Sequence, residues 1–255
     1  MNEKLLELCE EPGLWLPGEP KLSVFHGQNY VFIAYGRSAW VQRLRLEADE
    51  IDEVVDRIEA MLGLKGLDEG TWWLGELTTP VDLGERLLER GFEPDDPAEM
   101  TSFTIDEPPA GAASVEVRRA ESFEEALQAL EIDWEAFAVS EDERDLRRVE
   151  AEQAWPRIQA DGRQTTYVAY DAGGEPVGFA RAVFTMTAGL LLGGATLPGA
   201  RGKGVYTSLV HARWEEAVER GIPRLAVSAG PQSAPILERL GFEPIGKVQL
   251  LRQRL

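Results

Sequence analysis

The sequence repeats a short pattern toward the end of each half. The segment "LLERGFEPDD" at 87–96 resembles "LERLGFEPIG" at 237–246. Each copy holds the end of an expected helix, then a glycine, then Phe-Glu-Pro. A glycine after the last helical turn adopts the left-handed conformation that ends the helix, and the phenylalanine anchors the next strand. The pattern therefore predicts the same helix–strand unit twice.

The residues before each copy support a duplication. "TWWLG" and "TTPVDL" precede the first copy, and "RLAVS" and "AGPQSAPIL" precede the second. Both are a short apolar segment followed by a proline-marked helix start. The spacing from Pro80 to Gly91 and that from Pro231 to Gly241 differ by one residue. A shared order of elements at a long period indicates an internal repeat.

We therefore expect two related domains, at 1–107 and 112–255, joined by the Pro/Gly/Ala linker "DEPPAGAAS" at 106–114. In the first domain, "YVFIAY" and "AWVQRLRL" have the composition of strands. A helix follows, because apolar residues keep helical spacing and a glycine stands at the expected end. These residues are Ile51, Val54, Val55, Ile58 and Leu62, with Gly63 as the stop.

The second domain adds helical sequence to the same plan. A strand near 115–119 is followed by helices at about 122–138 and 142–160, two strands in "TTYVAYDAGGEPVGFARAVF", a strand in "GLLLGGATL" and a helix at 201–220. This order predicts a mixed α/β domain. On the last helix we expect one apolar face and one polar face. The apolar face holds Tyr206, Leu209, Val210, Trp214 and Ala217, and the polar face holds Ser208, Glu215 and Glu219, with His211 at the surface.

Charge and composition limit the kinds of partner. The formal net charge of −19 disfavours nucleic acid and anionic membranes, because both are bound through clustered Lys and Arg. Cys9 is the only cysteine, and His26 and His211 are the only histidines, so we expect no disulfide framework and no metal site. No apolar run approaches a membrane span and the start of the chain lacks a signal-peptide core, so we expect a cytoplasmic protein.

The stretch "PGARGKGVY" at 198–206 is basic and glycine-rich, and it lies between an expected strand and an expected helix. It does not fit the P-loop, since Leu197 and Gly204 stand where that motif needs Gly and Ser or Thr. It also lacks the third glycine of the dinucleotide motif. Two interpretations remain: a tight turn, or a loop whose amides bind an anion at a helix N-terminus.

The order of elements around this loop resembles the GNAT acetyltransferase superfamily. Its signature is Arg or Gln, two residues, Gly, one residue, then Gly or Ala. Arg201, Gly202, Lys203, Gly204 and Val205 follow it, and Tyr206 stands where a small residue is usual. Pro198 and the ending "LERLGF" also match, and the resemblance covers about 112–255.

The resemblance implies a fold, a cosubstrate and an activity. The fold is α/β, a mostly antiparallel mixed sheet flanked by helices and present as two related domains, the N-terminal one degenerate. The activity is acetyl transfer from acetyl-CoA to a small-molecule or side-chain amine. By resemblance, the residues that contact the cosubstrate are Thr196, Leu197, Arg201, Gly202, Lys203, Gly204, Val205 and Tyr206.

The catalytic residues are not evident from the sequence. Many family members have a tyrosine four residues before the glycine of "GF", and Leu237 stands there. Tyr206 and Glu135 are weak candidates for the missing acid or base; packing explains Tyr206 equally well, and a solvated helix face explains Glu135. Tyr170 and Glu141 are open to the same two explanations.

Two further alternatives stay open. A CoA-binding regulatory or scaffold protein that has lost catalysis fits the same loop, and so does a transferase for another acyl group. The N-terminal domain is expected to bind no CoA, because "RLEADEID" places Asp49, Glu50 and Asp52 where a basic loop would belong. The acyl acceptor and the oligomeric state are not evident from the sequence.

Overall fold

The computed structural model describes residues 2–17 and 22–255. The N-terminal half begins with helix α1 and ends with a long strand, and an apolar face of α2 packs on its sheet. Its elements are α1 (Asn2–Glu10), the 3-10 turn η1 (Pro12–Trp15), β1 (Ser23–His26), β2 (Val31–Tyr35), β3 (Ser38–Gln42), α2 (Ile51–Lys65), β4 (Glu69–Leu74), α3 (Leu83–Glu89) and β5 (Glu93–Ile105).

The C-terminal half has the order expected from its sequence, with two helices after the first strand. Its elements are β6 (Glu116–Arg119), α4 (Phe123–Ala136), α5 (Glu141–Asp161), β7 (Gln164–Tyr170), β8 (Pro176–Phe184), β9 (Gly189–Thr196), the 3-10 turn η2 (Pro198–Ala200), α6 (Val205–Glu219), β10 (Leu225–Ala229), α7 (Ala234–Arg239) and β11 (Glu243–Arg254).

The predicted repeat corresponds to a repeated structural unit. β4-α3-β5 and β10-α7-β11 follow the same course, and each helix ends at a glycine of positive φ, Gly91 at 88° and Gly241 at 94°. Phe92 and Phe242 are both buried directly after these glycines. A glycine tolerates this left-handed turn without steric cost, so the chain can leave the helix and enter the next strand at once.

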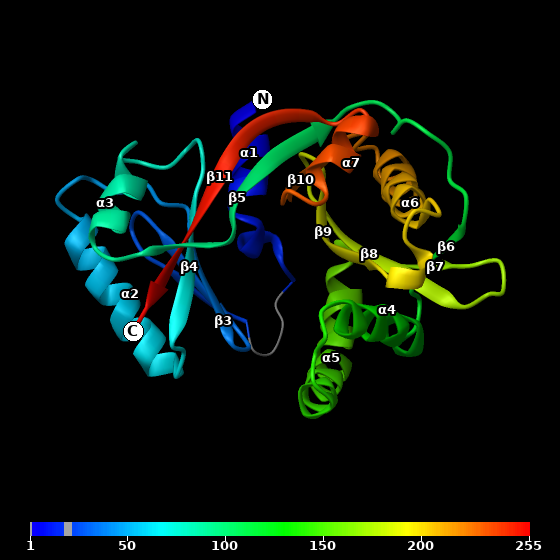
Figure 1. Cartoon of the computed structure of the whole chain (residues 1–255), viewed down its shortest axis with the longest axis horizontal. Coiled ribbons are helices and arrows are strands. Elements are labelled where there is room, and N and C mark those ends of the chain that lie inside the picture. Colours follow the sequence, from blue (N-terminus) through cyan, green and yellow to red (C-terminus); the bar gives the residue numbers. More distant parts are fainter. Residues whose placement is uncertain (1, 18–21) are drawn as a thin grey trace.

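The two halves exchange their last strands. The sheet has 11 strands in the order β1-β2-β3-β4-β11-β5-β10-β9-β8-β7-β6. β5 therefore pairs antiparallel with β10 of the C-terminal half, and β11 pairs antiparallel with β4 of the N-terminal half. In Figure 1 these two long strands arch side by side between the halves. The division of the chain at 107 and 112 stays a prediction. The strand before the linker, β5, pairs with the C-terminal half, so the sheet does not divide at the linker.

The cores follow the exchanged strands. Leu251 of β11 belongs to the N-terminal core under α2 and α3, whereas Phe103 and Ile105 of β5 belong to the C-terminal core under α6 and α7. Helix α1 of the N-terminal half also contacts the C-terminal half. Its residues Leu5, Leu8 and Cys9 pack against β9 and β10. Each half thus depends on side chains of the other for part of its apolar core.

Several local expectations were wrong. Gly63 lies inside α2, which continues to Lys65 and ends at Gly66 in the left-handed conformation. The helix expected from 201 starts at Val205. Ser208 is buried, because its hydroxyl accepts hydrogen bonds from the Ser114 and Val115 amides at 2.9 and 3.3 Å.

His211 is also not a surface residue. It is half-buried, and its Nε2 atom is buried without a hydrogen-bond partner among the described residues. The strand expected through 39–46 stops at Gln42, since Arg43 adopts a positive φ of 55°.

Candidate functional site

The first component of the site is a split between two parallel strands. β9 and β10 pair only at Gly189–Leu225 and Leu190–Ala226. β9 then continues to Thr196 and β10 to Ala229 without further pairing to each other. Diverging strands leave backbone amides and carbonyls open along both edges, and an extended chain with amide groups can pair there.

A bulge lies in β9 beside this split. The register against β8 shifts between Ala180 and Arg181, which leaves Gly193 as the extra residue. Gly193 has a φ of 58° and, like Gly194, is exposed. A bulged residue loses its partner in the ladder, so the regular pairing of β9 with β8 is interrupted at Gly193.

The glycine-rich loop forms the N-terminus of α6. Gly202 and Gly204 have φ values of 76° and 80°, and Gly204 is the N-cap. The first amides of a helix have no intrahelical acceptor, and within residues 2–17 and 22–255 the amides of Gly202, Lys203 and Gly204 have no acceptor either. Successive free amides at a positive helix end form an anion site.

A residue at the end of the linker, Ser114, holds this loop through a hydrogen bond. The Ser114 hydroxyl donates a hydrogen bond to the Lys203 carbonyl at 3.1 Å. A Cβ placed on Gly204 would lie 2.1 Å from Ser114 Oγ. A side chain at Gly204 would therefore disturb the turn itself, independently of any anion, and Lys203 is the better position for testing anion binding.

A pocket of about 1060 Å³ lies over the loop, and some of the residues predicted to contact the cosubstrate line it. Leu197, Lys203 and Val205 line it together with Glu135, which is exposed. Arg201 instead donates from Nε to the Thr196 carbonyl at 3.3 Å.

The three weaker candidates differ in their surroundings. Tyr206 is half-buried, and burial raises its pKa. Tyr170 lines the loop pocket, and its hydroxyl donates to Gln128 Oε1 at 2.8 Å. Glu141 is exposed and pairs with Arg144 at 3.7 Å on α5.

A second pocket, of about 730 Å³, lies between the two halves of the chain. Its walls are α4 and α5, the edge of β7 and β8, and the β2–β3 turn of the N-terminal half. Asp133 of α4 faces Arg181 of β8, with 3.4 Å between Oδ2 and Nη2. Burial raises the pKa of Asp133, although Arg181 opposes the rise. Arg181 also reaches the bulge, because a Cβ on Gly193 would lie 3.7 Å from its Nε.

Sequence reasoning missed Asp133 and Arg181. A signal for Asp133 was present, since Ala126, Ala129, Leu130 and Asp133 keep helical spacing, and all four line this pocket. A carboxylate on the apolar face of a helix calls for a partner or a ligand. The contribution of the N-terminal half had no such signal, because the β2–β3 turn is distant in the chain.

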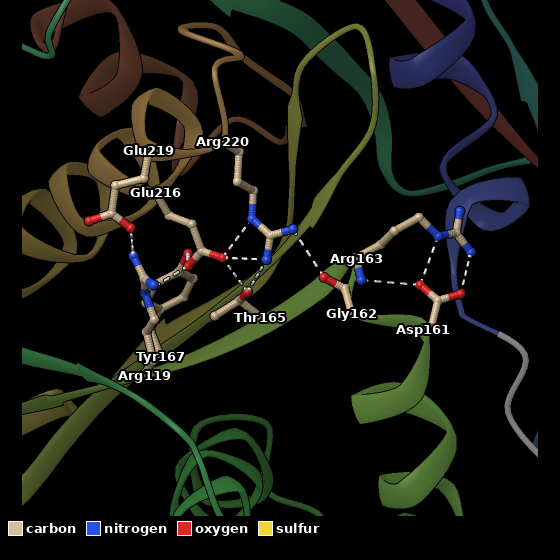
Figure 2. Close-up of polar contacts among 9 residues, drawn as sticks. All are labelled: Arg119, Asp161, Gly162, Arg163, Thr165, Tyr167, Glu216, Glu219 and Arg220. Carbon is tan, nitrogen blue, oxygen red and sulfur yellow. Dashed lines mark hydrogen bonds and ion pairs between the residues drawn. The ribbon is translucent and has the colours of Figure 1, made fainter.

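A buried polar cluster anchors the other end of α6 to the sheet (Figure 2). Glu216 is 2% exposed and sits between groups from β6, β7 and its own helix. It accepts hydrogen bonds from the Tyr167 hydroxyl at 2.5 Å, from Thr165 Oγ1 at 2.7 Å and from Arg220 Nη2 at 2.6 Å, and it pairs with Arg119 at 3.0 Å. Arg119 also pairs with Glu219.

Comparison with known proteins identifies the fold. Residues 126–242 match the Acetyltransferase (GNAT) family. That segment of the chain carries the GNAT domain. The fold of the whole chain is a tandem of two GNAT-like halves, since a tandem GNAT protein from the clavulanic acid biosynthesis pathway, solved without AcCoA, superimposes with a TM-score of 0.65. That likeness is at 16% identity and covers 96% of this chain and 87% of the other.

Two further structures show the same fold over similar lengths. A GCN5-related N-acetyltransferase from Kribbella flavida has a TM-score of 0.68 at 17% identity, over 91% of this chain and 90% of the other. One from Sphaerobacter thermophilus has a TM-score of 0.63 at 18% identity, over 98% and 90%. No curated protein matches the sequence. At these identities the likeness establishes the GNAT fold and not a substrate.

The described residues contain neither a metal-binding cluster nor a membrane-spanning helix. Within 2–17 and 22–255, no group of three or more His, Cys, Asp or Glu side chains is placed to hold a metal ion. In the same part of the chain, no helix combines the length and apolarity needed to cross a membrane.

Proposed function

We propose that the C-terminal GNAT half binds acetyl-CoA and transfers its acetyl group to an amine. The observation that carries the proposal is the set of free amides at Gly202, Lys203 and Gly204 at the start of α6, next to the β9–β10 split. A pyrophosphate fits the amides and the helix dipole. An amide-bearing arm fits the open edge of β9 that ends at Thr196 and Leu197.

The bulge supplies the other requirement of acyl transfer. The thioester oxygen gains negative charge as the amine attacks, and a fixed amide aimed at it lowers the barrier. Gly193 and Gly194 are exposed at the bulge of β9, and their amides are the candidates for this donor. The attacking amine must be neutral, whereas a lysine-type ammonium has a pKa of about 10.4. Removing its proton falls to a carboxylate or to water.

Among the residues that the structure describes, none is evident as the acid for the departing thiolate. Leu237 is fully buried in the C-terminal core, and burial raises the pKa of Tyr206, which makes its hydroxyl a poorer donor. Loss of a general acid or base typically slows a reaction about 10² to 10⁴-fold. The proposal therefore includes slow turnover with water as the proton source. The same observation favours a second candidate, a CoA-binding regulatory protein.

Release of free CoA thiol separates these candidates. Acetyl-CoA is offered with polyamines, aminoglycosides, amino acids, lysine peptides and aromatic amines. Saturable, amine-dependent release that disappears in Lys203→Glu and persists in Lys65→Glu supports transfer. Lys65 is a suitable control because it lies on α2 and bonds only Ser23. Tight acetyl-CoA binding with no amine-dependent release supports the regulatory candidate. The cytoplasmic location and the absence of nucleic-acid partners stay predictions.

A further inference from the structure

The pocket of about 730 Å³ between the halves is lined by six aromatic rings. Its rings come from both halves: Tyr35, Trp40, Phe123, Trp134, Trp155 and Phe179. Trp134 and Phe179 are fully buried, but the other four are only half-buried. Partly exposed rings that converge on a concavity are typical of a site for a flat apolar ligand.

The N-terminal half supplies a wall of this pocket. Tyr35, Arg37 and Trp40 lie in and around the β2–β3 turn, and α4 and α5 of the C-terminal half form the opposite side. Trp40 is held in place because it pairs with Ile33 across the β2–β3 hairpin and with Thr71 of β4. A side chain on a rigid strand is positioned more precisely for ligand recognition than one on a flexible loop.

The polar end of the pocket is Asp133. Its side chain is 20% exposed, and its ion pair with Arg181 is long, at 3.4 Å. Arg181 lies beside the bulge, since a Cβ on Gly193 would be 3.7 Å from its Nε. The Asp133–Arg181 pair therefore marks the end of the pocket that is nearest to the thioester position of the proposed function. The lining holds four carboxylates and three guanidinium groups, so a cation is tolerated there. A carboxylate at this depth binds an ammonium more strongly than one in open water.

We propose that the acyl acceptor is a primary amine carried on an aromatic or similarly flat apolar group. Asp133 binds its amino group, and the β2–β3 turn of the N-terminal half selects its body through Trp40. This inference rests on the proposed function for the transfer step. It also gives the N-terminal half a role, because that half forms the wall of the C-terminal half's acceptor pocket that selects the substrate.

The test compares amines of similar basicity and different bodies. Tryptamine and phenethylamine are the aromatic probes, and n-butylamine and spermidine are the aliphatic ones. We expect kcat/KM for the aromatic amines to exceed that for n-butylamine by about tenfold or more. Trp40→Ala should raise the amine KM about tenfold and leave the acetyl-CoA KM unchanged. Phe25→Ala removes an exposed ring on β1, two strands away from Trp40, and should change neither constant.

Asp133→Asn tests the polar end. It should raise the KM for every amine, whereas Glu131→Gln should not. Glu131 is a matched control because it lies on the same helix and pairs with Arg148 at 3.5 Å on the surface. Preference for spermidine, or a Trp40→Ala variant with wild-type constants for tryptamine, would overturn the inference.

Direct binding keeps the inference testable if transfer fails. Tryptamine is titrated calorimetrically into the wild type and into Trp40→Ala and Asp133→Asn, with CoA present and absent. Binding that both substitutions weaken, without any thiol release, would support the aromatic-amine site while refuting acetyl transfer. No tryptamine binding by the wild type would refute the site itself. Thermal melting of each variant separates lost binding from lost folding.

Discussion

Replacing Glu216 is expected to destabilise the C-terminal half strongly. Glu216→Ala removes the acceptor of two hydroxyl groups and the counter-charge of Arg119 and Arg220. The Tyr167 hydroxyl lies beneath α6 and is left buried without its acceptor. The substitution thus loosens the attachment of α6 to β7, at the end opposite the glycine-rich loop.

The loss of stability in Glu216→Ala depends on which of the former partners of Glu216 water can solvate in the variant. Breaking a fully buried ion pair costs about 3–5 kcal/mol. Arg119 and Arg220 have side chains that are 44% and 34% exposed, so water recovers much of their loss. The stranded Tyr167 hydroxyl costs about 1–3 kcal/mol. We expect a loss of about 2–4 kcal/mol for Glu216→Ala and about 1 kcal/mol for Tyr167→Phe.

Urea denaturation followed by far-UV circular dichroism measures these losses. Glu215→Ala is the matched control, because Glu215 is exposed on the same helix and should cost less than about 0.5 kcal/mol. The Glu216–Tyr167 double-mutant cycle should show coupling of about 1 kcal/mol. If the free energies of unfolding of Glu216→Ala and Glu215→Ala agree to within about 0.5 kcal/mol, the range typical of surface substitutions, the cluster does not anchor α6.

The same carboxylate gives the protein an acid-sensitive component. Burial alone raises the pKa of Glu216, but hydrogen bonds from Tyr167, Thr165 and Arg220 outweigh it and hold the pKa below 4.5. The folded state therefore binds this proton less readily than the unfolded chain does. Its stabilisation is present above pH 4.5 and is lost as the pH falls through the lowered pKa. Glu216→Gln should flatten this acid limb.

Three other predictions concern separate parts of the molecule. Burial raises the pKa of Glu11 from 4.5 to about 7, opposed by Arg45 at 3.1 Å. The unfolded chain loses this proton first, so stability should fall by about 3 kcal/mol as the pH rises across that window, and Glu11→Gln should remove the fall. Cys9 is fully buried and its pKa is raised to about 12 by that burial, so a thiol reagent should label it only after urea unfolding; fast labelling of the native protein would show that α1 is not docked. Gly204→Ala should cost more than 1 kcal/mol, on the scale of about 1–3 for strained φ values, whereas Gly199→Ala, with no atom within 4 Å of its Cβ, should be nearly neutral by thermal melting.

The sequence predicted elements better than it predicted their partners. The glycine-stopped repeat and the basic loop depend on local backbone chemistry, which short segments specify. The exchange of β5 and β11 depends on which edge each strand meets, and an apolar pattern does not encode that choice. Ser208 was misplaced for a related reason, because its burial depends on the amides of Ser114 and Val115, which are distant in the chain.

The pocket between the halves was not predicted either, because segments that are distant in the chain form it. Asp133 carries a local signal, since it falls on an apolar helix face, but Trp40 becomes a pocket residue only through the contact of the two halves. Sites assembled from distant segments require the tertiary structure. The cosubstrate loop, in contrast, is a continuous stretch, and motif spacing was enough to propose it.

The N-terminal half keeps the shape of a strand split but closes it. β3 and β4 run parallel at only two positions, as β9 and β10 do. Beyond them, the Thr79 amide donates to the Leu44 carbonyl at 3.1 Å and the Leu46 amide donates to the Thr79 carbonyl at 3.0 Å. The buried Glu10 carboxylate accepts from the amide of Glu76 at 2.7 Å. These contacts occupy the edges that a cosubstrate arm would need.

Calorimetric titration with acetyl-CoA tests the central claim, that one cosubstrate site lies at the start of α6. The account predicts one molecule bound per chain. Lys203→Glu places a negative charge against the pyrophosphate and should weaken binding by about tenfold or more, while the same change at Lys65 should leave it unaltered. Two sites per chain, or equal affinity in wild type and Lys203→Glu, would contradict the account.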